Sequence, residues 1–188
     1  EDANDEKNEV AQKTAEFIEE RIAIINRELD NTESELATFK QRSGLTDLTS
    51  NAQIALQEKN RYEQQLTENA TQLNLVQDLQ NYLQDSKNTN EVIPSNIGLQ
   101  DANLKTAINQ YNTLILERKR LLRTSTENNP AVIDINFQIE AMRSNVQTSI
   151  VSVLRGLKIT HSNLKREVNK LTNRISDAPN QEREFMTI

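Results

Sequence analysis

The sequence predicts an all-α protein, an elongated antiparallel coiled-coil bundle of about four long helices. Only 35% of its 188 residues are hydrophobic and 4% are aromatic, which supplies no more than a thin core. Glycine and proline, three residues of each, are rare, and long unbranched side chains that lose little freedom in a helix are abundant. Apolar residues also recur in alternating steps of three and four, which keeps one stripe of a helix facing a partner helix.

The first helix is expected over residues 6–43. Its heptad seam predicts a line of residues that face a partner helix. These are Ala11, Ala15, Ile18, Ile22, Ile25, Leu29, Thr32, Leu36 and Phe39. Gly44 follows Lys40 and Arg42 and has the position of a residue just beyond a helix end.

The second helix is expected over residues 46–85, with a weaker seam that three polar residues interrupt. The seam reads Leu45, Leu48, Ala52, Ala55, Lys59, Tyr62, Leu66, Asn69, Leu73, Val76, Gln80 and Leu83. Residues 86–100 then break the period, because Pro94 and Gly98 lie there among Asn, Ser and Thr. This segment is predicted to be the longest connection.

The third helix is expected over residues 101–123, and its seam consists of Leu104, Ile108, Tyr111, Ile115 and Leu122. After an interruption at residues 125–129, Asn129 and Pro130 have the pattern of an N-cap followed by a proline in the first helical position.

The fourth helix is expected over residues 130–177, a length of roughly 70 Å at 1.5 Å per residue. Pro179 is expected to stop it, because proline disfavours a helical conformation at the residue before it. The seam reads Ile139, Met142, Val146, Ile150, Val153, Leu157, His161, Leu164, Val168, Leu171 and Ile175. Short polar connections make the four helices antiparallel neighbours in a single helical rod over residues 1–188.

The charges of the chain are distributed unevenly. Residues 1–40 contain twelve acidic and five basic side chains, whereas residues 150–178 contain six basic and two acidic ones. If the first and last helices are antiparallel neighbours, residues whose numbers sum to about 182 lie opposite each other. This register places Glu16 and Glu20 opposite Arg166 and His161, and Glu9 opposite Arg174.

The basic residues of the last helix have two interpretations. The first, which we favour, is that they pair with the acidic first helix and set its register and orientation. The second is that they face an acidic partner or polymer, such as a polysaccharide or a lipid-linked phosphate, through Coulomb attraction. The candidate residues for this role are Arg155, Lys158, Lys165, Arg166 and Lys170.

A second basic cluster and one histidine have simpler explanations. The cluster ends the third helix, where cations offset the negative end of the helix dipole. It consists of Arg118, Lys119, Arg120 and Arg123. His161, the only histidine, occupies a seam position and is expected to be packed and hydrogen-bonded.

No catalytic, cofactor-binding or metal site is predicted. The sequence has no cysteine, no glycine-rich phosphate loop and no second histidine, and its carboxylates are scattered. Asp2 and Asp5 are too few for a calcium site. A net charge of -6 argues against nucleic acid as a partner.

No run of residues approaches the roughly 18 apolar residues of a membrane span. Helical patterns reach both ends of the sequence, so we expect it to be a part of a longer protein.

Residues 17–48, FIEERIAIINRELDNTESELATFKQRSGLTDL, resemble the helix that leaves the base domain in bacterial polysaccharide co-polymerases. These proteins are also called chain-length determinants, and the sequence is most similar to those fused to a cytoplasmic tyrosine autokinase. The matching positions in this stretch are Glu35, Leu36, Phe39, Lys40, Gly44, Leu45 and Asp47. Further matches follow in the family's order: Val92, Ile93 and Pro94; Leu99, Gln100, Asp101 and Leu104; Tyr111, Asn112, Leu114, Arg118 and Leu121; Asn129 and Pro130; Ala178, Pro179, Glu182 and Arg183.

The resemblance implies a periplasmic helical projection of an inner-membrane protein that controls the chain length and export of capsular polysaccharide or exopolysaccharide. Family members form homo-oligomeric rings and work with polysaccharide, a polymerase and an outer-membrane exporter. The membrane helices, most of the base and any kinase domain lie outside this sequence, so no enzymatic activity is expected of it. Two alternatives stay open: the adaptor hairpin of an efflux or secretion system, and a rod that regulates a membrane tyrosine kinase.

Overall fold

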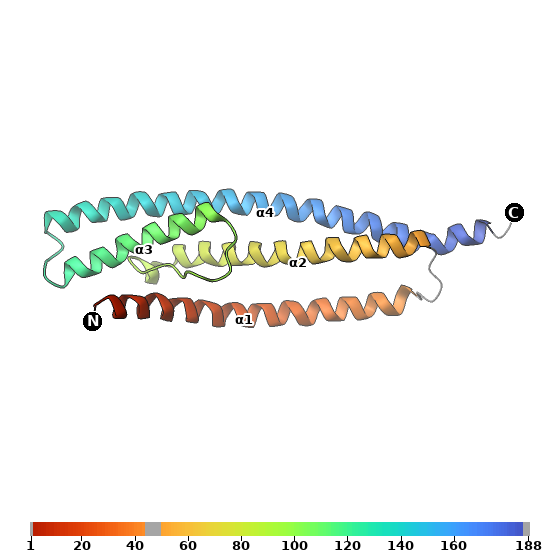
Figure 1. Ribbon diagram of the computed structural model, residues 1–188, viewed down its shortest axis with the longest axis horizontal. Coiled ribbons are helices and arrows are strands. Elements are labelled where there is room, and N and C mark those ends of the chain that lie inside the picture. Colours follow the sequence, from red (N-terminus) through yellow and green to blue (C-terminus); the bar gives the residue numbers. More distant parts are fainter. Residues whose placement is uncertain (1, 44–49, 186–188) are drawn as a thin grey trace. The chain divides into compact units, whose positions relative to one another are not determined.

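The computed structural model describes the backbone of residues 2–43 and 50–185 and the side chains of residues 3–35, 51–178 and 180. In this part of the chain there are four α-helices, one short 3-10 helix and no strand (Figure 1). They are α1 (Asp2–Ser43), α2 (Ser50–Gln84), η1 (Ser86–Asn88), α3 (Ala102–Leu122) and α4 (Pro130–Phe185). The predicted all-α fold class is confirmed.

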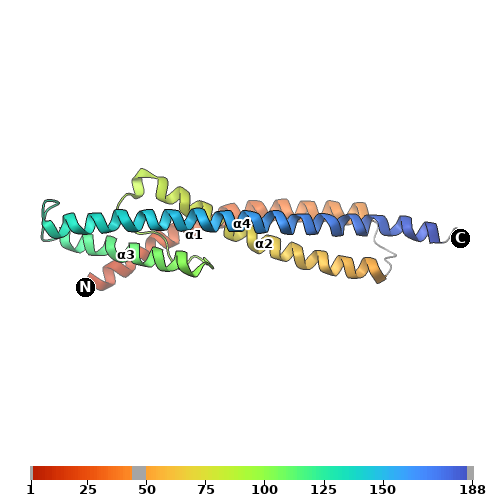
Figure 2. The ribbon, with the colours of Figure 1, turned by 90° about the horizontal axis from the view of Figure 1, so that it is seen from above.

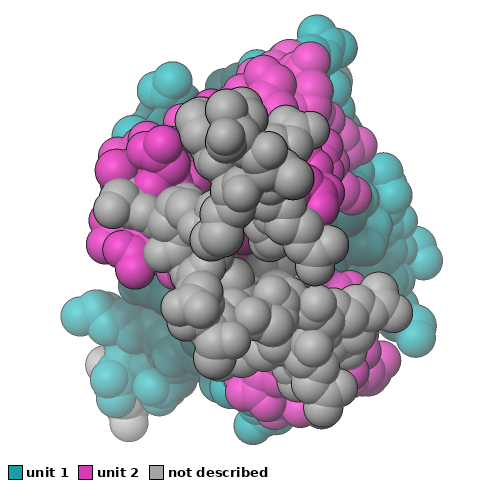
Figure 3. All heavy atoms as spheres, turned by 90° about the vertical axis from the view of Figure 1, so that its right-hand side faces the viewer, with its two compact units in different colours: residues 1–22, 72–156 teal, residues 23–71, 157–188 magenta. Residues whose placement is uncertain are grey.

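The helices form two compact units, which Figure 3 colours separately. Unit 1 comprises residues 1–22 and 72–156, and unit 2 comprises residues 23–71 and 157–188. The helices α1, α2 and α4 each contribute a segment to both units, whereas α3 belongs to unit 1 alone. α3 adds a fourth helical segment to unit 1 and none to unit 2.

Unit 1 contains most of the fully buried side chains. Two views show α3 beside the first half of α4 (Figures 1 and 2), and Arg118 Nε of α3 donates a hydrogen bond of 2.8 Å to Asn136 Oδ1 of α4. Its largest fully buried residues include Val76, Leu79, Val92, Ile93, Leu104, Tyr111, Ile115, Val132, Ile139, Val146 and Ile150. The seams predicted for α3 and α4 supply most of the residues that these helices contribute, so those two seams are confirmed. The α2 seam is buried at Ala52, Ala55, Val76 and Leu83, but Leu75 and Leu79 are also buried and lie outside it. Leu45 and Leu48 lie outside the described residues.

The seam predicted for α1 is wrong in its orientation. Ile18, Ile22, Ile25 and Leu29 are 37%, 51%, 40% and 53% exposed, whereas Phe17 is 6% exposed. The buried face is therefore rotated by about a quarter turn from the predicted one. Leu36 and Phe39 lie outside the residues whose side chains the structure describes, and Gly44 lies outside the described chain.

Polar contacts explain this rotation of α1. Arg21, only 6% exposed, donates from Nη1 to Asp78 Oδ2 of α2 at 2.9 Å. Thr14 Oγ1 accepts a hydrogen bond of 3.2 Å from the backbone N–H of Ser95. Arg21 and Thr14 lie on the same face of α1 as Phe17. That face, and not the apolar seam, is thus held against the rest of unit 1.

The helix ends are partly as predicted. Asn129 Oδ1 accepts a hydrogen bond of 2.8 Å from the N–H of Ala131, which confirms the predicted N-cap of α4. The end expected near residue 177 is wrong, because α4 continues through Pro179 to Phe185. A proline inside a helix costs about 3 kcal/mol, and the residues at 181–184, Gln, Glu, Arg and Glu, favour helix and offset part of that cost.

The loop between η1 and α3 is clamped at both ends by buried amide side chains. Asn112 accepts from Ile93 N–H at 2.7 Å and donates to the Ile93 carbonyl at 2.8 Å. Gln72 donates to the Gly98 carbonyl at 2.8 Å and accepts from Gln100 N–H at 3.1 Å. Both amides are nearly inaccessible, with 6% and 9% exposure. The backbone N–H and C=O of buried Ile93 thus have side-chain partners.

Unit 2 has a thin core. Ala55 of α2 packs with Leu171 and Ile175 of α4, and Leu56 and Tyr62 are partly buried against them. Two further buried atoms, Asn69 Oδ1 and His161 Nδ1, have no hydrogen-bond partner among the described residues. The hydrogen bond expected for His161 is therefore not made at Nδ1.

Replacing the Asn112 clamp should destabilise unit 1. Asn112→Leu leaves the buried N–H and C=O of Ile93 without partners, so we expect a loss of about 2–4 kcal/mol in the free energy of unfolding, measured by urea titration. Asn103→Leu, at an exposed position of the same helix, is the matched control. Equal losses in the two variants would refute the structural role of the clamp.

Alkaline pH should also destabilise unit 1. Burial, with a smaller contribution from the Glu91 charge, raises the pKa of Tyr82, and burial raises the pKa of Tyr111. The unfolded chain therefore loses these protons at lower pH than the folded chain. The contribution of these two tyrosines to the free energy of unfolding is fully present below the ordinary tyrosine pKa of 10.0, and it decreases as the pH rises above that value. The urea midpoint should decrease from about pH 9 to about pH 11, and less so in Tyr82→Phe. An unchanged midpoint would contradict this expectation.

Candidate functional site

The candidate basic residues lie on one exposed face of α4. Successive residues of a helix turn by about 100°, so the five cations cover roughly 140° of its circumference. All five are exposed: Arg155, Lys158, Lys165, Arg166 and Lys170. Val151 and Ile159 lie on the same side and are 47% and 58% exposed. We call this surface the basic face.

The cations of the basic face make few contacts, and those are within α4. Arg166 donates to Asn163 Oδ1, and Lys170 Nζ lies 3.4 Å from Glu167 Oε1. Arg155, Lys158 and Lys165 form no ion pair or hydrogen bond with the described residues. The positive charge of this face is therefore not neutralised by another helix in the described structure.

The antiparallel register predicted between the first and last helices is wrong, because α1 and α4 run in the same direction in unit 1 (Figure 1). Glu9 pairs with Lys119 of α3 and not with Arg174. Glu16 interacts within α1, with Lys13 Nζ at 3.9 Å and Gln12 Nε2 at 3.4 Å. The physical reason is that the loop before α3 returns along α2 to Gln72, so that α3 runs in the same direction as α2 (Figure 1). The cations at the end of α3 therefore meet the first turns of α1.

The basic cluster at the end of α3 has a larger role than offsetting the helix dipole. Lys119 Nζ bridges Glu9 Oε1 of α1 and Glu91 Oε2 of the loop, the latter at 3.1 Å. Burial lowers the pKa of Lys119, but the hydrogen bonds to Glu9 and Glu91 outweigh it and hold that pKa above its ordinary value. Sequence reasoning missed this bridge, because nothing in the sequence brings positions 9, 91 and 119 together.

An apolar stripe with acidic flanks lies on α1. Ile18, Ile22, Ile25 and Leu29 follow one another along a single face of this continuous helix, and all are exposed. In the heptad pattern Glu19, Glu28 and Glu33 occupy the flanking positions, which are also exposed. We call this surface the α1 stripe. It has the pattern of one half of a coiled coil.

The described residues contain no group of three or more His, Asp or Glu side chains arranged to hold a metal ion. Among the described helices, none combines the length and apolar character that crossing a bilayer requires. No protein-family model, curated protein or solved structure matches this chain. Two open surfaces lie on the described helices, the basic face of α4 and the α1 stripe.

Removing the Lys119 bridge should destabilise unit 1. Lys119→Met leaves Glu9 and Glu91 as neighbouring negative charges, so we expect a loss of about 1–2 kcal/mol in the free energy of unfolding. The loss should shrink in about 1 M salt, which screens the repulsion. Lys170→Met, on the basic face, should change stability by less than about 0.5 kcal/mol. Equal effects of the two substitutions would show that the bridge is not structural.

Proposed function

We propose that this chain is the helical periplasmic scaffold of an inner-membrane polysaccharide co-polymerase, which controls the length and export of capsular polysaccharide or exopolysaccharide by assembling with copies of itself. The ordered set of motifs that resembles this family supports the proposal. One structural observation carries it further: the basic face of α4 has no acidic partner helix within the described chain. A charged, open face on a long helix suits a scaffold that binds other molecules.

The two open surfaces complement each other in charge. Residues 16–35 of α1 contain seven acidic and two basic side chains, whereas residues 151–174 of α4 contain six basic and one acidic. Both surfaces also expose large apolar residues, such as Ile22 at 51% and Ile159 at 58%. Burying the apolar groups supplies free energy, and the opposite charges favour the pairing of unlike surfaces over like ones.

We therefore propose that the α1 stripe of one copy packs against the basic face of the next copy. A contact between two different surfaces is heterologous, and repeated heterologous contacts produce rings when the rotation closes. The membrane anchor of the parent protein raises the local concentration of the chains, so a weak contact between helices is sufficient. The basic residues then contribute to assembly, with an acidic polymer as the competing occupant of the same face.

Charge reversal in the parent protein tests this proposal. Lys165→Glu combined with Arg166→Glu should weaken cross-linking between copies in the membrane and broaden the polymer length distribution. Adding Glu19→Lys and Glu33→Lys should restore both properties, because the two surfaces again carry opposite charges. Lys87→Glu, on η1, is the control and should change neither.

The outcomes separate the two occupants of the basic face. If the α4 reversal alters polymer length and the α1 reversal does not compensate, the basic face binds acidic polymer and the copy-to-copy contact is wrong. If the α4 reversal leaves both cross-linking and polymer length unchanged, the scaffold role of this face is refuted. The absence of cysteine from the sequence permits single cysteines to be introduced as cross-linking sites.

A further inference from the structure

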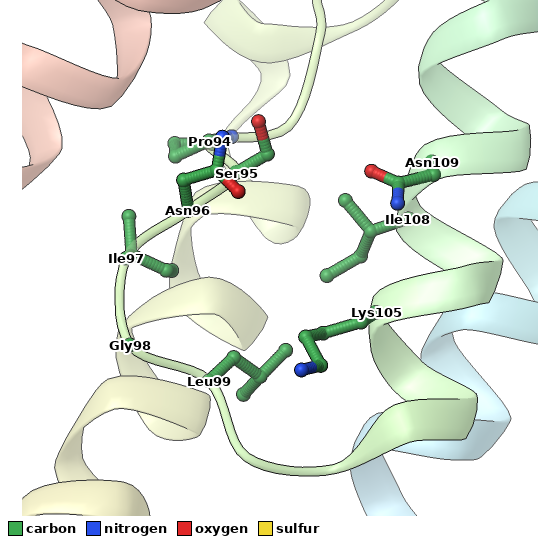
Figure 4. Close-up of a pocket in the computed structure, with 9 residues that line it drawn as sticks. All are labelled: Pro94, Ser95, Asn96, Ile97, Gly98, Leu99, Lys105, Ile108 and Asn109. Carbon is green, nitrogen blue, oxygen red and sulfur yellow. The ribbon is translucent and has the colours of Figure 1, made fainter.

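A pocket of about 350 Å³ lies within unit 1, between the loop that precedes α3 and the first half of α3 (Figure 4). Its lining residues are Pro94, Ser95, Asn96, Ile97, Gly98, Leu99, Lys105, Ile108 and Asn109. The volume is at the lower end of the range of roughly 300–1,000 Å³ that is common for small-molecule sites.

The loop side of the pocket is fixed before any ligand binds. Asn112 holds the loop at Ile93, and Gln72 holds it at Gly98 and Gln100, through hydrogen bonds of 2.7–3.1 Å. Because these amides are buried, the loop between them has little freedom to collapse into the pocket. A ligand therefore pays little for ordering the site.

The clamped loop leaves a row of hydrogen-bond donors without partners. The backbone N–H groups of Asn96, Ile97, Gly98 and Leu99 make no hydrogen bond within the described part of the chain. Asn96 has φ 58° and Gly98 has φ 89°, while the residue between them has a negative φ. Left-handed residues of this kind occur in nests, in which successive backbone N–H groups bind an anion.

Lys105 adds a positive charge to these donors. Its side chain extends from α3 toward the loop (Figure 4), and it forms no ion pair with the described residues. Asp101, one turn earlier, accepts the Leu104 N–H at 2.8 Å as the N-cap of α3. The nearest carboxylate along α3 is thus engaged in capping, and the ammonium group of Lys105 stays available to an anion.

The remaining lining suits a ring that carries hydroxyl groups. The amides of Asn96 and Asn109 and the hydroxyl of Ser95 donate and accept hydrogen bonds, and none of these side-chain groups has a partner among the described residues. Ile108 projects from α3 between them, and Leu99, which is 7% exposed, closes the lower side in this view (Figure 4). The apolar wall suits the C–H face of a sugar ring, and the polar groups beside it suit the hydroxyl groups of that ring.

From these features we propose that the pocket binds a small sugar acid. Lys105 and the N–H groups of residues 96–98 hold its carboxylate, and Asn96 and Asn109 bind its hydroxyl groups over the apolar surface of Ile108. Charge-assisted hydrogen bonds supply most of the discrimination in favour of the acid. The proposal depends on the pocket itself and stands whether or not the scaffold function is correct.

Titration of the 188-residue chain with sodium glucuronate, followed by the NMR shifts of backbone amides, tests the proposal. We expect saturable shifts at residues 96–99 and 105, with an affinity at least about tenfold higher than for glucose, which lacks the carboxylate. Acetate, which has the charge but no ring, should also bind at least about tenfold more weakly. No saturable shift at these residues, or equal affinity for all three probes, would overturn the proposal.

Two variants and one control locate the binding. Lys105→Met keeps the stem of the side chain and removes the charge, so it should weaken glucuronate binding by about tenfold or more. Asn109→Trp, at an exposed helix position, should fill the pocket and abolish binding while the circular dichroism spectrum is unchanged. Lys87→Met is the matched control and should bind as the unmodified chain does. Equal weakening by Lys87→Met would assign the effect to general charge and refute the site.

Discussion

The arrangement of unit 1 depends on how two buried amides, Asn112 and Gln72, hold the loop between η1 and α3. Without the bonds of Asn112 the buried N–H and C=O of Ile93 would be unpaired, a cost of about 1–3 kcal/mol for each group. With them, the loop is fixed, so that Ser95 is in place to contact Thr14 of α1 and Glu91 is in place to pair with Lys119 of α3. The loop thus determines where α3 and the first turns of α1 pack.

This dependence explains which parts of the fold the sequence predicts. The seams of α3 and α4 are correct, because in each of these helices a single apolar stripe is buried and local periodicity defines it. In α2 the buried face also includes Leu75 and Leu79, which the predicted seam omits. In α1 the stripe is equally regular, yet Arg21 and Thr14 lie on a different face and have partners at Asp78 and Ser95. Polar partners that are 57 and 81 residues distant leave no periodic signal in the sequence, so the rotation of α1 could not be predicted.

The candidate site, too, could be predicted from the sequence only in part. Sequence reasoning identified the five cations of α4 correctly as a group on one helix, because helical spacing alone places them together. It paired them with the acidic residues of α1, because charge balance does not specify which cations are nearest. The cations at the end of α3 reach Glu9 first, since α3 runs in the same direction as α2 in unit 1. Glu9 is therefore paired with α3, and the cations of the basic face have no ion pair with α1 among the described residues.

The two units differ in how completely their polar groups are satisfied, and this difference bears on assembly. In unit 1 the buried amides are hydrogen-bonded, whereas in unit 2 buried atoms of Asn69 and His161 have no partner among the described residues. A small apolar core and unpaired buried groups make local opening easier there than in unit 1. Most of the α1 acids and α4 cations proposed to bind between copies belong to unit 2. A partner that binds only the folded state stabilises that state. Contact with a second copy would therefore stabilise unit 2, which is the less stable unit on its own.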